Sequence, residues 1–236
     1  MTGRDRFAAA SRGEGVAFAP FVWERLPHFV HQHADGWWRD GTTVRRFLLD
    51  VAGLARADAM VIGGCADALR TVAAGGTGVN VLDRFAGTDE AHDAFAVVSV
   101  LADSAPFAAV AWLPDLRLLT ETLGGGGDEA AEVAEDAVCD LARGFLDAGA
   151  DALLVMSADA EAVRAAAHRV AGVAHYYGRP LLAAAGSTAW VEGRDEVAVH
   201  VLGEDAAPPV TGIVLTEDVS ATWDADRLAA VGREVR

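Results

Sequence analysis

Lysine is absent from this chain of 236 residues, and all 19 basic residues are arginine. Schiff-base aldolases, pyridoxal-phosphate enzymes and P-loop nucleotide hydrolases each need a lysine amine, so the composition excludes these three classes. Asparagine and glutamine are also scarce, with Asn80 and Gln32 the only examples. This pattern fits a compositional bias toward Arg, Ala and Gly, but the chemical exclusion holds whatever its origin.

Cysteine and long apolar runs are scarce as well. Cys65 and Cys139 are too few and too far apart for a disulfide framework or a thiolate zinc site. No apolar run approaches the roughly 18 residues that span a membrane, and the N-terminus has no apolar signal core. Because 52% of the residues are hydrophobic, the chain can bury a core of its own. We expect a single domain in the reducing cytoplasm.

Charge is unevenly distributed along the sequence. The net charge is −16; the first 60 residues carry 8 arginines and 7 acidic residues, and the remaining 176 carry a net charge of −17. A field of this sign repels nucleic acid and anionic membranes, so we expect neither as a partner. An anionic small molecule is expected to bind against the first 60 residues.

Strand-like and helix-like segments alternate along the chain. Expected strands cover 17–22, 58–63, 107–112, 152–156, 179–185, 196–202 and 212–215, with a short excursion strand at 79–82. Expected helices cover 27–36, 42–55, 90–101, 128–146, 160–175 and 224–235. Nearly all the strands are apolar, which favours a parallel sheet covered by helices. Six or seven such units predict an α/β fold, a TIM-like (β/α)8 barrel that is trimmed or irregular in its C-terminal third.

Several stretches, taken in order, resemble the uroporphyrinogen decarboxylase superfamily. They are 4–14 (RDRFAAASRGE), 106–123, the Gly-Ala-Asp at 149–151, the Gly-Arg-Pro at 178–180, and 212–236. The resemblance implies that residues 1–236 form one TIM-like barrel, often dimeric in this family, with a cleft at the C-terminal ends of the strands. Members of the family include the porphyrinogen decarboxylase and zinc-dependent methyltransferases that serve corrinoid proteins.

The sequence departs from both patterns. The decarboxylase carries Arg-Gln-Ala-Gly-Arg-Tyr after its first strand, where this chain has Trp23-Glu-Arg-Leu-Pro-His28, with Arg25 as the counterpart. Its Phe-Ser-Asp after the second strand is replaced by Ile62-Gly-Gly64, unless Asp67 substitutes. The methyltransferase His-x-Cys is replaced by residues 183–187, AAAGS. Neither activity is therefore supported residue by residue.

Histidines cluster after the first predicted strand. His28 and His31 share a face if a helix starts there, and with Glu24 or Asp35 they would hold a borderline metal. The alternative is a partly exposed helix with incidental histidines, which we favour. No cofactor is therefore predicted, and a divalent metal at His28 and His31 stays the alternative.

Two further side chains lie at the end of that strand. Arg25 would clamp a carboxylate through its planar guanidinium, and Trp23 would stack on a flat ligand. An aromatic patch buried under a loop or at a dimer contact explains Trp23 equally well.

Charged residues also follow later strands, at the carboxyl ends that form the catalytic end of a barrel. These residues are Asp67, Asp83, Arg84, Asp115 and Asp159. Carboxylates converging at a barrel mouth serve as acids or bases when burial tunes them. In so acidic a chain, solvated loop acids are the commoner explanation for each one.

Two function hypotheses follow. The first is a divergent uroporphyrinogen decarboxylase-like enzyme that acts on a carboxylate-bearing ligand by decarboxylation or, as a less favoured option, methyl-type group transfer. Arg25 would position the carboxylate, His28 or His31 would transfer a proton, Asp67 or Asp115 would orient the reacting group, and Trp23, Arg84 and Asp159 would bind substrate. A role in porphyrin biosynthesis is implied by the resemblance alone. The second hypothesis is a non-catalytic barrel that binds a ligand or a protein partner. The resemblance also implies a homodimer.

Overall fold

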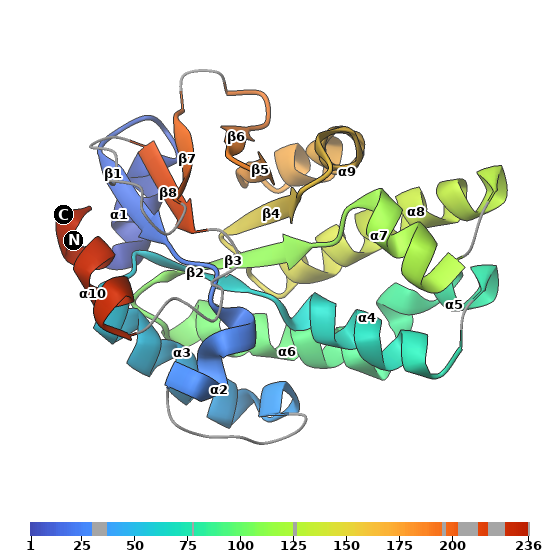
Figure 1. Ribbon diagram of the computed structural model, residues 1–236, viewed down its shortest axis with the longest axis horizontal. Helices are drawn as coiled ribbons and strands as arrows, with labels where there is room; N and C mark the ends of the chain where they lie inside the picture. The colour runs from blue at the N-terminus through green and yellow to red at the C-terminus, as the bar shows by residue number, and fades with distance from the viewer. Residues whose placement is uncertain are drawn as a thin grey trace.

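The structure is a computed structural model that describes residues 1–29, 37–76, 78–124, 127–194, 197–202, 212–216 and 225–235. Its described strands form two sheets (Figure 1). The five-stranded sheet has the order β2-β3-β4-β5-β6, and these strands are β2 (Ala59–Ile62), β3 (Ala108–Leu113), β4 (Ala152–Ser157), β5 (Leu181–Ala185) and β6 (Thr188–Val191). Its strands are parallel except for β6, which runs antiparallel to β5. The second sheet has the order β1-β8-β7 and is fully parallel, with β1 (Val16–Ala19), β8 (Gly212–Thr216) and β7 (Val199–Leu202).

The two sheets meet at β1 and β2. The backbone N–H of Asp58 donates to the Phe18 carbonyl over 2.8 Å, and that of Val61 donates to the Pro20 carbonyl over 3.4 Å. The Asp58 carboxylate also accepts a hydrogen bond from the Phe18 N–H at 3.1 Å. At the other side β6 contacts β7. The α/β class is confirmed, but the ladders of the described strands remain split into two sheets, so strand pairing alone does not close a ring.

Helices cover the sheets on the outside. The longer ones are α1 (Gly3–Ala10), α3 (Gly41–Ala55), α4 (Gly64–Ala74), α6 (Asp89–Ser104), α8 (Asp128–Asp147), α9 (Ala160–Tyr176) and α10 (Ala225–Glu234). The short ones are η1 (Trp23–Arg25), α2 (Leu26–Phe29), η2 (Trp37–Arg39), α5 (Val79–Asp83), η3 (Phe85–Gly87), α7 (Leu116–Leu119) and the π-helical turn η4 (Thr120–Gly124). Figure 1 shows α3, α4 and α6 together on one side of β2 and β3. Helix α3 buries Val44, Phe47, Leu48 and Val51, the apolar stripe that its sequence period predicts.

One predicted element is wrong. The segment expected as a strand at 79–82 is the helix α5, which packs against α8 and η4. Val79 and Val81 favour strands only where a neighbouring strand is present to pair with, and here the neighbours are helices. Helix α4 and strand β6 were not anticipated.

Four of the parallel strands are buried on both faces, as helix-covered parallel strands require. Every residue of β2, β3, β5 and β8 is buried. Among the helices in the described ranges, none is long and apolar enough to cross a membrane.

Candidate functional site

A cavity of about 600 Å³ opens at the carboxyl ends of the strands. Its wall includes Phe21 after β1, Trp112 near the end of β3, Ser157 at the end of β4, Gly186 after β5, and Val201 on β7. Both sheets therefore contribute to one cavity. The carboxyl ends of parallel strands are where α/β proteins bind ligands, because the following loops converge there.

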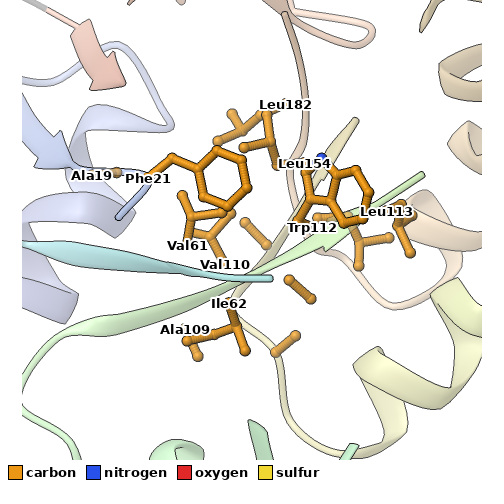
Figure 2. Packing of buried hydrophobic residues seen from close by; sticks show 14 of the residues in the cluster. Ala19, Phe21, Val61, Ile62, Ala109, Val110, Trp112, Leu113, Leu154 and Leu182 are labelled. Atoms are coloured by element: carbon orange, nitrogen blue, oxygen red, sulfur yellow. The ribbon is translucent and has the colours of Figure 1, made fainter. Parts of the chain in front are cut away.

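Two aromatic rings form part of the cavity wall. Phe21 and Trp112 stack with their ring centroids 6.4 Å apart and their planes 22° from parallel, and Figure 2 shows the two rings beside each other. Each residue is 7% exposed, so only part of each ring faces open space. The Trp112 indole N–H donates to the Met156 carbonyl at 3.3 Å. The backbone N–H of Phe21 donates to the buried Thr216 hydroxyl at 2.8 Å. These two hydrogen bonds fix the indole and the Phe21 backbone before any ligand arrives.

The wall is mostly apolar, with a few polar groups. Besides the indole, the lining side chains that carry hydrogen-bonding groups are Arg70 on α4, Thr122 in η4 and Ser157. The Ser157 hydroxyl accepts from the Asp159 N–H at 3.1 Å, so its own proton remains available to donate. Apolar walls with a few placed polar groups are typical of small-molecule sites. π-helical turns such as η4 occur frequently at functional sites.

Arg25 and Trp23 lie together in η1, but outside the cavity wall. Trp23 is 1% exposed and packs so closely on Gly63 that a Cβ there would lie 2.6 Å from the indole Cγ. Its ring also lies 4.9 Å from that of Trp37. Trp23 is therefore a buried aromatic residue packed against Gly63 and Trp37, and it does not face the cavity. Arg25 is half-buried, and its Nε has no hydrogen-bond partner in the part of the chain described.

The predicted histidine pair is only partly described. His28 lies on α2, is exposed, and meets the Phe29 ring edge-on at 6.3 Å. His31 lies outside the described residues. Across the described ranges, no group of three or more His, Cys, Asp or Glu side chains is placed to hold a metal ion.

Two predicted carboxylates are helix caps. Asp115 is 4% exposed and accepts a hydrogen bond from the Leu118 N–H at 2.7 Å at the start of α7. Asp159 accepts from the backbone N–H groups of Glu161 and Ala162 at the start of α9, and Arg117 Nη1 lies 2.8 Å from its Oδ2. The backbone N–H of Ala162 and the Arg117 guanidinium hold the pKa of Asp159 below its ordinary value. Both carboxylates thus stabilise the first turn of a helix.

Arg84 and Asp67 complete the predicted set. Arg84 is exposed and its Nε donates to the Asn80 carbonyl at 2.9 Å, away from the cavity. Asp67 lies on α4, the helix that contributes Ala66, Leu69 and Arg70 to the wall; its side chain lies outside the description. Of the predicted residues with described side chains, none lines the cavity.

The residues that form the wall were missed because they look like core. Phe21, Trp112 and Met156 are apolar residues at strand ends, and periodicity assigns such residues to the interior. The usable signal was positional: a bulky residue in the last two positions of a parallel strand, or just beyond it, lies where the loops converge.

No protein-family model matches the chain, and no curated protein matches it. Membership of the uroporphyrinogen decarboxylase superfamily stays a prediction carried by the stretches that resemble it.

Proposed function

We propose that this chain is a ligand-binding barrel protein whose site is the cavity lined by Phe21 and Trp112. The proposed ligand is a mid-sized, flat molecule with an apolar face and a carboxylate. The observation that carries this proposal is the stacked aromatic pair in a cavity at the carboxyl ends of strands from both sheets. A volume of about 600 Å³ lies within the range of roughly 300–1,000 Å³ that small-molecule sites occupy.

A TIM-like barrel is part of this proposal. The hydrogen bonds between β1 and β2, the contact between β6 and β7, and the shared cavity all support two sheets that form the halves of one TIM-like barrel. The antiparallel β6 fits the expected irregular C-terminal third. A cytoplasmic location and a homodimer stay predictions from the sequence.

The lining matches the ligand in two parts. An aromatic face would stack beside Phe21 and Trp112, a contact worth about 0.5–1.5 kcal/mol beyond the area it buries. The Arg70 guanidinium would face the carboxylate, with Thr122 and Ser157 as further hydrogen-bonding groups. The polar groups would set the orientation of the ligand, and the rings would supply most of the affinity.

The test is calorimetric titration with 2-naphthoate, which has both features, and with 2-naphthol and cyclohexanecarboxylate, which each lack one. We expect 2-naphthoate to bind tightest. Ala158 is exposed at the rim, so Ala158→Trp should fill the cavity and remove binding without loss of folding. Ala131→Trp, on an exposed position of α8 outside this cavity, is the matched control. Equal binding to both variants, or no binding to the wild type, contradicts the proposal.

A second candidate is carboxylate chemistry of the kind the resemblance implies. It is favoured by α4, which carries Asp67 and also contributes Arg70 to the cavity wall. In a decarboxylation the bond to the carboxylate carbon breaks, CO2 leaves, and a proton takes its place. The described wall carries no imidazole and no carboxylate. We therefore assign the acid of this candidate to Asp67 or His31, predicted residues whose side chains lie outside the description. Release of CO2 from uroporphyrinogen, abolished by Asp67→Asn or by His31→Gln but not by His92→Gln on α6, would support this candidate; no CO2 release contradicts it.

A further inference from the structure

A second hollow lies at the opposite ends of the strands and is rich in arginine. It has a volume of about 230 Å³, and its wall includes Arg4, Arg12, Arg179 and Arg194 with Asp151 as the one acidic residue among the described residues that line it. These positions precede β1, β4 and β5 or follow the antiparallel β6, so they gather at the amino ends of the parallel strands. The hollow is separate from the cavity of the proposed function.

The charge of this hollow is opposite to that of the molecule. Its walls carry four guanidinium groups against one carboxylate, whereas the whole chain has 35 acidic and 19 basic residues. Glu14 pairs with Arg12 at 3.2 Å, but both side chains are more than half exposed, so that pair adds little. The net charge of the protein repels anions, whereas the local positive charge of this hollow attracts them.

Contacts between distant segments hold Arg4, Arg179 and Arg194 in place. Arg4 Nε lies 3.1 Å from Asp151 Oδ2, and Arg4 Nη1 donates to the Ala102 carbonyl at 2.8 Å. Arg194 Nη1 donates to the Ser11 carbonyl at 3.0 Å, across 183 positions of the sequence. Asp151 also holds Arg179, whose Nη1 is 3.6 Å from Oδ1. Because these contacts exist without a ligand, part of the ordering of these three side chains precedes binding.

Donor groups are left over after these contacts. Arg12, Arg179 and Arg194 each use one of their three guanidinium nitrogens in a contact with another described residue. An adjoining hollow of about 280 Å³ also has Arg179 and Arg194 in its wall, together with Glu192. Guanidinium groups bind phosphate and carboxylate oxygens through paired N–H donors.

We infer that this hollow, defined by Arg4, Arg12, Arg179 and Arg194, binds a compact anion with two or more negative charges. The shared chemistry is that of a phosphate group or a small polycarboxylate, held by the guanidinium donors. Two of the four arginines come from the first 60 residues, the less acidic part of the chain.

The test is titration of the full chain with pyrophosphate and, separately, with citrate at constant ionic strength, followed by calorimetry and by thermal unfolding. We expect at least one of the two anions to bind and to raise the unfolding temperature, and the pair of probes distinguishes a phosphate from a polycarboxylate ligand. The double variant Arg12→Gln/Arg179→Gln should weaken binding at least about tenfold, since each lost charged hydrogen bond contributes on that order.

The matched control is Arg143→Gln/Arg233→Gln, which removes two exposed arginines elsewhere and changes the net charge equally. The inference predicts that the control binds as the wild type does. It is overturned if neither anion binds, or if the two double variants weaken binding to the same extent, because the effect would then be one of overall charge. The affinity for 2-naphthoate should be unchanged in both double variants, because this ligand binds in the other cavity.

Discussion

Replacing Arg6 tests whether the junction of the two sheets depends on a buried ion pair. Arg6 Nε and Nη2 each lie 2.6 Å from Asp58 Oδ1, and Asp58 Oδ2 accepts the Phe18 N–H. The Asp58 side chain is 1% exposed. This carboxylate therefore connects α1 to β1 at the point where β1 meets β2.

The size of the effect follows from the burial of the carboxylate. Arg6→Met keeps most of the aliphatic length but removes the cation, and removing one partner of a buried pair costs about 3–5 kcal/mol. An exposed pair contributes about 0–1 kcal/mol. Arg143→Met, which removes the partner of Asp140 where both side chains are more than half exposed, is the matched control.

The assay is urea unfolding at neutral pH. We expect Arg6→Met to lose about 3–5 kcal/mol of unfolding free energy and the control less than about 1 kcal/mol. Arg6→Met/Asp58→Asn should recover part of the loss, because the neutral amide needs no cation while its oxygen still accepts the Phe18 N–H. A loss below about 1 kcal/mol in Arg6→Met, or no recovery in the double variant, would refute the reasoning.

Three further predictions concern helix caps, packing and thiols. Because the pKa of Asp159 is lowered in the folded protein, its ionised carboxylate stabilises the fold above the ordinary pKa, and this stabilisation is lost as the pH falls through the lowered pKa. The difference in unfolding free energy between wild type and Asp159→Asn should therefore shrink as the pH drops below about 4. A difference that does not depend on pH would contradict this. Gly63→Ala places a Cβ 2.6 Å from Trp23 Cγ and should cost about 1–3 kcal/mol in thermal or urea unfolding, whereas a neutral effect would show that Trp23 is free to move. Burial raises the pKa of the Cys65 thiol, so Ellman's reagent should leave it unmodified in the native protein at pH 8 and label it in urea; rapid native labelling would disagree.

The regular elements were predictable because their sequence periods are strong. Helices α3, α8 and α9 carry apolar stripes at helical spacing, and β2 and β3 are continuous apolar runs. The helix α5 was not predictable, because its valines favour a strand until the neighbouring helices are known.

The candidate site was harder to predict, for a different physical reason. Asp115 and Asp159 precede helices, and the preference of aspartate for N-caps explains both positions without a ligand. Phe21 and Trp112 are far apart in sequence and apolar, and only the folded arrangement of the two sheets brings their rings to the same cavity. A prediction based on chemically reactive residue types therefore selects helix caps and misses the apolar residues that line the cavity.

The most direct test of the proposed site is a nuclear magnetic resonance titration of the 15N-labelled full chain with 2-naphthoate. The account predicts shifts of the Trp112 indole N–H together with the amides of Thr122, Ser157 and Gly186, which belong to the ends of three different strands or the turns that follow them. Shifts confined to other residues, or no shifts at saturating 2-naphthoate, would contradict the claim that this cavity is the ligand site.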